Sequence, residues 1–253
     1  MIMEIDELSL QPGEVQVWVL DRDVLGELSQ RASATLSGEE LSQSLRLADP
    51  DLARLWLGRR VGVRQLLAAY TGLRPRELRL LRLPGQKPCM APTQPGPRFS
   101  VSASGGWMAA AFGQEELGLD MELVRDDLAW EGLAQRFFSA DELAWVQAQP
   151  NMACQRQSFF QVWTRKEAQL KLRGLGLAGL ESLRERNGLG RSWVEDLALP
   201  LPLCGSLSLE RPPAWLRLRR WPSSVAAGEP TRQKKATMQP TDRSPVAASL
   251  SPP

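Results

Sequence analysis

An α+β fold is the class this sequence predicts, and three observations carry that prediction. The composition suits a globular protein, since 43% of the 253 residues are hydrophobic and 24% are charged. Hydrophobic patterns of period two and of period 3.6 occur in turn along the chain. The predicted order is strand, helix, strands, and then strand, helices, strands, so residues 1–112 and 113–222 form two similar halves. Residues 223–253 are rich in Pro, Ser and Ala and are expected to be disordered.

The composition also limits the chemistry and the partners. The sequence contains no histidine, which excludes Ser-His-Asp and Cys-His machinery and His-ligated metal sites. A net charge of +2 gives no electrostatic reason to expect nucleic acid or membrane as a partner. Three cysteines without a CxxC pair indicate reduced thiols, and neither a signal peptide nor a membrane-spanning run is recognised. A cytoplasmic protein is therefore expected.

The first half begins with a strand and continues into helices. Val15, Val17 and Val19 alternate with other residues, which predicts the strand. Ser37 and Glu40 have the spacing of a capping box, and a long amphipathic helix from Leu52 to Tyr70 can end at Gly72. Its basic residues are Arg54, Arg59, Arg60 and Arg64. A basic helical face is usually solvated, and the alternative is that some of these side chains, such as Arg54, reach an anionic ligand.

The middle of the chain is predicted to hold a strand, a loop and a hairpin. Residues 78–83 read as a strand followed by the turn Pro84-Gly85, and Lys87-Pro88 comes next. Phe99–Phe112 has the pattern of a strand, a Ser/Gly turn and a second strand. The small residues from Ser102 to Gly106 could cradle an anion, or they could form a plain hairpin turn.

Residues 117–123, LGLDMEL, form the strand with the most chemical content. Leu117, Leu119, Met121 and Leu123 fall on one face. Asp120 and Glu122 fall on the other face, with Cα atoms about 6.6 Å apart by strand geometry. One interpretation is a solvated face of an antiparallel sheet. The other is a divalent-metal site, because magnesium is commonly held by one or two carboxylates together with phosphate oxygens.

The second half is predicted to be mainly helical before it returns to strands. Asp126–Ser139 reads as helical, and Ser139 with Glu142 forms a capping box for a short helix that ends before Pro150. Phe159–Leu177 reads as a helix ended by Gly174, with Glu167 and Lys171 on the same stripe as Phe160 and Trp163. These two charges could form an ordinary i,i+4 pair, or they could belong to a site. Short strands are expected at Trp193–Val194, Leu207–Leu209 and Trp215–Arg219.

Two patterns in the sequence are set aside. The GxGxxG match from Gly174 to Gly179 follows a helix, so it lacks the strand that a dinucleotide-binding motif requires. The basic residues Arg217, Arg219, Arg220, Lys234 and Lys235 are better explained as a solvated strand face and tail than as an RNA site.

Several segments together resemble the surfactin-type 4′-phosphopantetheinyl transferases. Gly118-Leu-Asp120-Met-Glu122 is similar to the family's G-(I/V/L)-D-x-E motif. Trp163-Thr-Arg-Lys166-Glu167-Ala168, followed by Lys171, is similar to its W-x-x-K-E-(A/S)-x-x-K motif. Lys87-Pro88, residues 99–105 (FSVSASG) and residues 136–139 (RFFS) resemble its G-K-P, F-N-(L/I)-S-H-S-G and R-F-F-(S/T) segments.

The resemblance implies a fold, a ligand and a reaction. Two α+β halves would be related by a pseudo-twofold axis, with coenzyme A between them. Asp120, Glu122 and Glu167 would hold Mg²⁺ against the pyrophosphate, and Glu167 would also act as general base. The remaining site residues implied are Lys166 and Lys171 for the phosphates, Lys87, Pro88 and Ser102 for the nucleotide end, and Arg54 for coenzyme A. A carrier-protein serine would attack the β-phosphate, giving holo-carrier protein and 3′,5′-ADP. A monomer is expected from the internal duplication.

The sequence also departs from the family pattern on the nucleotide side. Ala103 stands where the family usually has histidine, Gln86 is inserted into G-K-P, and Leu175 replaces a frequent lysine. Residues 40–43 lack lysines that some members use. The leading hypothesis is a Mg²⁺-dependent transferase acting on an acyl, polyketide or peptidyl carrier protein. Ala103 supports an alternative, a non-catalytic relative that binds carrier protein, and a structural protein with solvated acids is a third.

Overall fold

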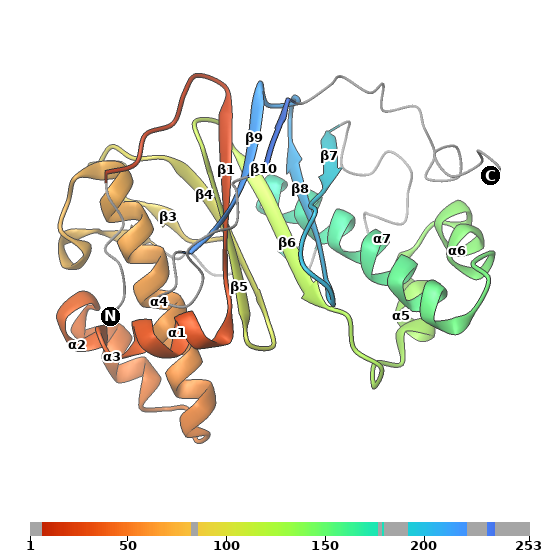
Figure 1. The fold of residues 1–253 in the computed structure, drawn as a ribbon, viewed down its shortest axis with the longest axis horizontal. Coiled ribbons are helices and arrows are strands. Elements are labelled where there is room, and N and C mark those ends of the chain that lie inside the picture. Colours follow the sequence, from red (N-terminus) through yellow and green to blue (C-terminus); the bar gives the residue numbers. More distant parts are fainter. Residues whose placement is uncertain (1–6, 82–85, 177–178, 180–191, 222–231, 236–253) are drawn as a thin grey trace.

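The described part of the chain folds into helices and three β-sheets, which confirms the predicted α+β class. A computed structural model describes residues 7–81, 86–176, 179, 192–221 and 232–235. In Figure 1 helices α1 to α4 lie on one side, strands occupy the centre, and α5 to α7 lie on the other side. Within the described residues, no helix has the length and apolar character needed to cross a membrane.

The larger sheet has five strands in the order β10-β9-β1-β5-β4. Their bounds are β1 Glu14–Leu20, β4 Arg98–Ser104, β5 Trp107–Gly113, β9 Trp215–Arg220 and β10 Arg232–Lys235. β1 is antiparallel to β5 and parallel to β9. The strands predicted near residues 15–19, 99–112 and 215–219 are confirmed, whereas the pairing of β9 with β1, across about 200 residues, was not foreseen.

The outer face of this sheet is covered by helices. They are α1 Arg22–Ser29, α2 Ala32–Thr35, α3 Gly38–Ser44 and α4 Pro50–Thr71. The predicted capping box of Ser37 and Glu40 is present, and α4 ends at Gly72, whose φ of 70° suits a residue without a side chain. Between α4 and the hairpin lie the short elements η1 Pro75–Glu77, β2 Leu80–Leu81 and β3 Cys89–Met90.

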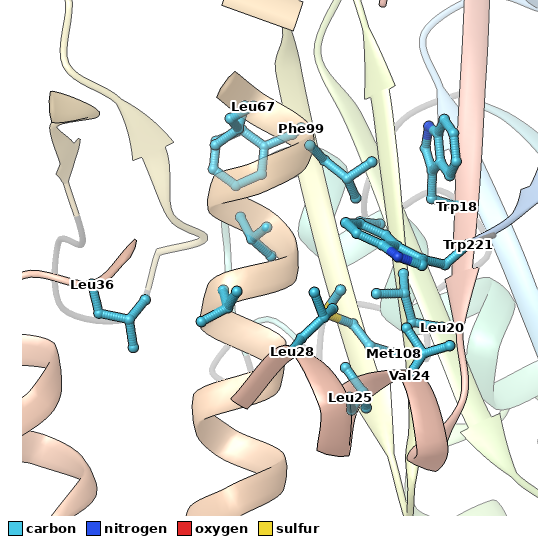
Figure 2. Packing of buried hydrophobic residues seen from close by; sticks show 14 of the residues in the cluster. Trp18, Leu20, Val24, Leu25, Leu28, Leu36, Leu67, Phe99, Met108 and Trp221 are labelled. Carbon is cyan, nitrogen blue, oxygen red and sulfur yellow. The ribbon is translucent and has the colours of Figure 1, made fainter. Parts of the chain in front are cut away.

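The first core cluster fills the space between these helices and the sheet. Figure 2 shows Leu25 and Leu28 of α1 facing Leu20 and Met108 of the sheet, and Leu67 of α4 belongs to the same cluster further up in the view. These five side chains are fully buried. Burial of one leucine or methionine side chain contributes on the order of 1.5–3 kcal/mol, so this cluster anchors α4 firmly on the sheet.

The second sheet has three strands in the order β6-β8-β7. They are β6 Leu117–Leu123, β7 Trp193–Asp196 and β8 Leu203–Leu209. Leu117, Leu119 and Met121 of β6 are fully buried in a cluster shared with Val17 and Ala109 of the larger sheet. Because side chains alternate along a strand, Gly118, Asp120 and Glu122 lie on the opposite face, as predicted.

Helix α7 Met152–Arg173 covers that opposite face. Helices α5 Trp130–Phe137 and α6 Ala140–Gln147 pack against α7. α7 begins seven residues before the predicted Phe159, because Asn151 caps it by accepting a hydrogen bond from the Cys154 N–H. Gly174, with a φ of 68°, ends α7 as predicted. Figure 1 shows α7 running alongside β6 and β8.

The predicted division at residues 112 and 222 stays a prediction, as does the pseudo-twofold axis. β9 belongs to the second half in sequence and is hydrogen-bonded into the sheet of the first half. Within the predicted disordered segment 223–253 the structure describes one strand, β10, and the rest of that segment lies outside the described residues.

Candidate active site

Asp120 is the centre of the site. It lies on β6 facing α7 and is only 3% exposed. Its Oδ1 accepts hydrogen bonds from Ser102 Oγ and from Lys171 Nζ, each at 2.8 Å. Its Oδ2 is buried and has no hydrogen-bond partner among the described residues. A buried carboxylate oxygen without a partner is costly, so this atom is suited to a ligand.

Glu122 lies two residues further along the same face of β6. Its Oε2 accepts a hydrogen bond of 2.6 Å from Ser104 Oγ. Burial raises the pKa of Glu122 above its usual value, the hydrogen bond from Ser104 opposes the rise, and the charge of Asp120 adds to it. The two carboxylates therefore share one electrostatic environment.

Glu167 brings a third carboxylate from α7. Burial, reinforced by the charges of Asp120 and Glu122 and opposed by Lys171, raises the pKa of Glu167 to about 7. Its Oε1 is buried and has no hydrogen-bond partner in the described part of the chain. A carboxyl group with a pKa near neutrality can exchange a proton at physiological pH, as a general base must.

Lys171 lies one helical turn after Glu167. Its Nζ contacts Asp120 Oδ1 at 2.8 Å and Ser102 Oγ at 3.0 Å. The ammonium group thus bonds to β6 and β4, which favours a shared site over a simple i,i+4 pair of Glu167 and Lys171. In this structure it supplies the positive charge beside Asp120.

A glycine permits the close approach of α7 to β6. A Cβ atom built on Gly118 would lie 1.9 Å from the carbonyl oxygen of Ala168 and 2.4 Å from the backbone nitrogen of Leu172. No side chain fits in that space. Gly118 is therefore what allows the acids of β6 and the charges of α7 to meet.

A second polar network fixes α7 on the far strand of the same sheet. Asp196 on β7 accepts two hydrogen bonds from Arg165, at 2.8 and 2.5 Å, and one from Gln161 at 2.5 Å. Burial by itself would raise the pKa of Asp196, but the hydrogen bonds and charge of Arg165 hold it below its usual value. The hydroxyl groups of Thr164 and Ser206, both fully buried, are hydrogen-bonded, with 3.0 Å between the two oxygens. This network sets the position of α7 across the sheet.

The three acids fit a hard cation by their chemistry. Asp120 Oδ2 and Glu167 Oε1 are buried oxygens without hydrogen-bond partners, and oxygen ligands are what Mg²⁺ prefers. In this structure, however, no three His, Cys, Asp or Glu side chains of the described residues converge closely enough to form a metal site. The fit rests on the type and burial of the oxygens rather than on a formed coordination sphere.

The other predicted site residues are divided between this cluster and other contacts. Ser102 is in the cluster, bonded to Asp120. Lys166 is 4% exposed and pairs with Glu142 of α6 at 2.9 Å, so it faces away from the acids. Lys87 pairs with Glu116 at 2.8 Å and donates to the Leu117 carbonyl at 2.6 Å, and Arg54 lies 3.5 Å from Asp51.

Two cavities adjoin the hairpin and meet at Ala103. One, of about 440 Å³, is lined by Ser104, Glu122, Arg125, Phe160, Trp163 and neighbouring residues. The other, of about 250 Å³, is lined by Trp56, Arg59, Arg60, Pro88, Val101 and neighbours. Ala103 borders both. The Ser/Gly turn between β4 and β5 is a hairpin turn with Gly105 at a φ of 55°, as one of the two interpretations predicts.

Sequence reasoning named Arg59 and Arg60 among the basic residues of this helix but selected only Arg54 as a site residue. Trp56, Arg59, Arg60 and Val63 have the i, i+3, i+4, i+7 spacing of one helical face, and that face lines the smaller cavity. Arg54 lies two residues before Trp56, about 200° around the helix, and so falls on another face. The spacing from Trp56 was the signal that could have selected the arginines that line this cavity.

Comparison with known proteins identifies relatives of this chain. Residues 116–198, which include all three acids, match the model of the 4′-phosphopantetheinyl transferase superfamily. The chain is 31% identical over 179 residues to 4′-phosphopantetheinyl transferase HetI of Nostoc sp., covering 70% of this chain and 75% of the relative. The chain belongs to the 4′-phosphopantetheinyl transferase superfamily.

Further relatives include members of the surfactin type. The transferase Sfp of Bacillus subtilis is 29% identical over 159 residues, which is 63% of this chain and 69% of Sfp. AcpT of Escherichia coli K12 is 40% identical over 90 residues, 35% of this chain and 45% of AcpT. The resemblance inferred from the motifs is thereby confirmed, together with the assignment of the chain as a transferase.

Proposed function

We propose that the chain transfers the 4′-phosphopantetheine arm of coenzyme A to a serine of an apo-carrier protein. The observation that carries this proposal is the cluster of Asp120, Glu122 and Glu167 with Lys171, in which two buried carboxylate oxygens lack a partner. Such a cluster suits a metal-bound pyrophosphate. The membership in a superfamily named for this transfer supports it.

The reaction is a phosphoryl transfer without a covalent enzyme intermediate. The serine Oγ of the carrier protein forms a bond to the β-phosphorus, and the bond from that phosphorus to the bridging oxygen of the pyrophosphate breaks. 3′,5′-ADP leaves with the electron pair of that bond. The serine proton passes to Glu167, directly or through a water molecule.

Mg²⁺ held by Asp120, Glu122 and Glu167 would neutralise charge on the transferring phosphoryl group. The residues of the chain provide the rest. Lys171, bonded to Asp120 in this structure, would supply positive charge beside a bound phosphate. Ser102 and Ser104 hold the carboxylates of β6 in place.

For the nucleotide end we propose the 250 Å³ cavity. Arg59, which donates a hydrogen bond to the Gly105 carbonyl, and Arg60, whose guanidinium lies over the Trp56 ring, supply positive charge to its wall. Pro88 borders the cavity, and Ala103 also lines the neighbouring cavity that Glu122 borders. Roles for Arg54, Lys87, Lys166 and Ser102 toward coenzyme A stay predictions, because none of these four residues lines the cavity. A cytoplasmic monomer is proposed as well, and sedimentation equilibrium tests its oligomeric state.

The test is a mass measurement. The protein is incubated with Mg²⁺, coenzyme A and a panel of apo-carrier proteins, and the mass gain of phosphopantetheine is sought. Transfer should require Mg²⁺ and should be lost in Glu167→Ala. Glu115→Ala is the matched control, because Glu115 is an exposed acid paired with Arg211 and is not part of the acid cluster.

Two results would argue against the proposal. Transfer that persists in Glu167→Ala would exclude the assigned base. Binding of a carrier protein without transfer, even at high coenzyme A, would favour the non-catalytic alternative that Ala103 suggests.

A further inference from the structure

Three alternate serines of β4 connect the two sheets. β4 is the edge strand of the larger sheet, and β6 is the edge strand of the smaller one. The Leu119 N–H donates to Ser100 Oγ at 3.1 Å, and the Leu123 N–H donates to Ser104 Oγ at 3.0 Å. Between these two bonds Ser102 donates its hydroxyl hydrogen to Asp120 Oδ1 at 2.8 Å, and its Oγ lies 3.4 Å from the Met121 carbonyl oxygen. Each serine thus faces a backbone group 19 positions further along the chain, so serine hydroxyl groups take the place of a backbone ladder.

Alternation along β4 gives the strand two different faces. Phe99, Val101 and Ala103 line the 250 Å³ cavity proposed for the nucleotide. The serines at the even positions point to β6. One strand therefore borders the nucleotide cavity with one face and contacts the acid-bearing strand with the other.

Ser104 makes a contact that Ser100 does not. Its hydroxyl group accepts the hydrogen bond of the Leu123 N–H and donates one to Glu122 Oε2 at 2.6 Å. The hydroxyl hydrogen is thus committed to one carboxylate oxygen. Asp120 is held by both Ser102 and Lys171, whereas Glu122 receives its hydrogen bond from Ser104.

We propose that Ser104 is a positioning residue that orients the Glu122 carboxylate for the divalent cation bound with Asp120 and Glu167. A glutamate side chain has several rotamers, and fixing one of them before binding removes part of the entropic cost of coordination. Groups that orient metal ligands typically change metal affinity about 10–100-fold when they are removed. The inference rests on the proposed metal-dependent function of this site.

The test compares two serines of the same ladder. Mn²⁺ alone is titrated into the full-length protein and followed by electron paramagnetic resonance, with no coenzyme A and no measurement of activity. Ser104→Ala should weaken Mn²⁺ binding at least tenfold, which is the lower end of the range for the loss of a residue that orients a metal ligand. Ser100→Ala removes a backbone hydrogen bond of the same kind without touching a carboxylate, so its Mn²⁺ affinity should stay within twofold of the wild type.

A hydroxyl-retaining variant separates orientation from packing. Ser104 borders the 440 Å³ cavity, which leaves room for one methyl group, so Ser104→Thr should keep the wild-type affinity. Ser104→Cys keeps the volume but offers only a weak donor, and it should lose affinity as Ser104→Ala does. Thermal unfolding of every variant establishes that the folded protein is being compared.

The outcomes distinguish this inference from the proposed function. Equal Mn²⁺ affinity in Ser104→Ala and the wild type, or equal losses in Ser100→Ala and Ser104→Ala, overturns the role of Ser104 and leaves the transferase assignment intact. A wild-type protein that neither binds Mn²⁺ nor transfers phosphopantetheine overturns the proposed function itself. If Ser104→Ala does not fold, a wild-type affinity in Ser104→Cys also overturns the proposal.

Discussion

Gly118→Ala should separate α7 from β6 and so disable the site. The new Cβ would lie 1.9 Å from the Ala168 carbonyl oxygen and 2.4 Å from the Leu172 backbone nitrogen. Both are backbone atoms within a helix and cannot turn aside, so α7 must move by more than about 1 Å to restore ordinary contact distances. Overpacking of this kind costs about 1–3 kcal/mol of stability, and a misplacement of about 1 Å at a catalytic group can lower the rate about 100-fold.

Urea unfolding and the initial rate of phosphopantetheine transfer measure the two effects. Gly132→Ala is the control, because the same substitution on helix α5 meets no atom within 4 Å. In a helix this change should be neutral or stabilising by up to about 1 kcal/mol. A Gly118→Ala protein with wild-type stability and rate would show that α7 does not depend on the glycine for its position.

Three further substitutions test other parts of the site. Because burial raises the pKa of Glu167 to about 7, the folded apo protein binds the proton more tightly than the unfolded chain, and stability should fall as pH rises from about 4.5 to 7. Glu167→Gln should remove about 1–2 kcal/mol of that loss of stability. This is about half of the free energy that the full pKa difference would give, because the carboxyl group is partly solvated. Identical pH profiles of thermal unfolding for the two proteins would contradict the assignment. Ala103→His should tighten coenzyme A binding about tenfold by calorimetry through one charge-assisted hydrogen bond, and an unchanged affinity would place residue 103 away from the nucleotide. Asp196→Ala should destabilise the protein by about 1–3 kcal/mol because it removes a partly buried acid that pairs with Arg165. Glu210→Gln removes the charge of a more exposed acid, which pairs with Arg173, and should change stability by no more than about 0.5 kcal/mol.

The local geometry of the site could be predicted from the sequence because it depends on strand and helix periods. Alternation along residues 117–123 correctly puts Asp120 and Glu122 on one face, whatever lies opposite. Helical spacing likewise correctly puts Glu167 and Lys171 on one side of α7. Neither period states which surfaces meet, and the motif resemblance supplied that information.

Contacts between distant segments could not be predicted from either period. Lys166 immediately precedes Glu167 in the motif. One residue is a step of about 100° around the helix, however, so the Lys166 side chain pairs with Glu142 on α6. β9 reads as a short strand in isolation, and only the assembled sheet shows that it pairs with β1. Arg54 was selected by charge alone, whereas the cavity selects a helical face.

The position of α7 explains why Glu167 is left without a partner. Asp120, Ser206 and Asp196 occupy one register row across β6, β8 and β7. Each of the three contacts α7, through Lys171, Thr164 and Arg165 respectively.

These three contacts hold α7 at a fixed position and rotation on the sheet. Glu167 lies between Thr164 and Lys171 in sequence, and its Oε1 is buried with no hydrogen-bond partner among the described residues. A helix held only by apolar contacts could rotate to release that carboxylate to water, but here rotation would break the buried bonds to Asp120, Ser206 and Asp196. The fold therefore keeps the pKa of Glu167 raised, and the energy that burial costs is available to a cation or a proton that binds there.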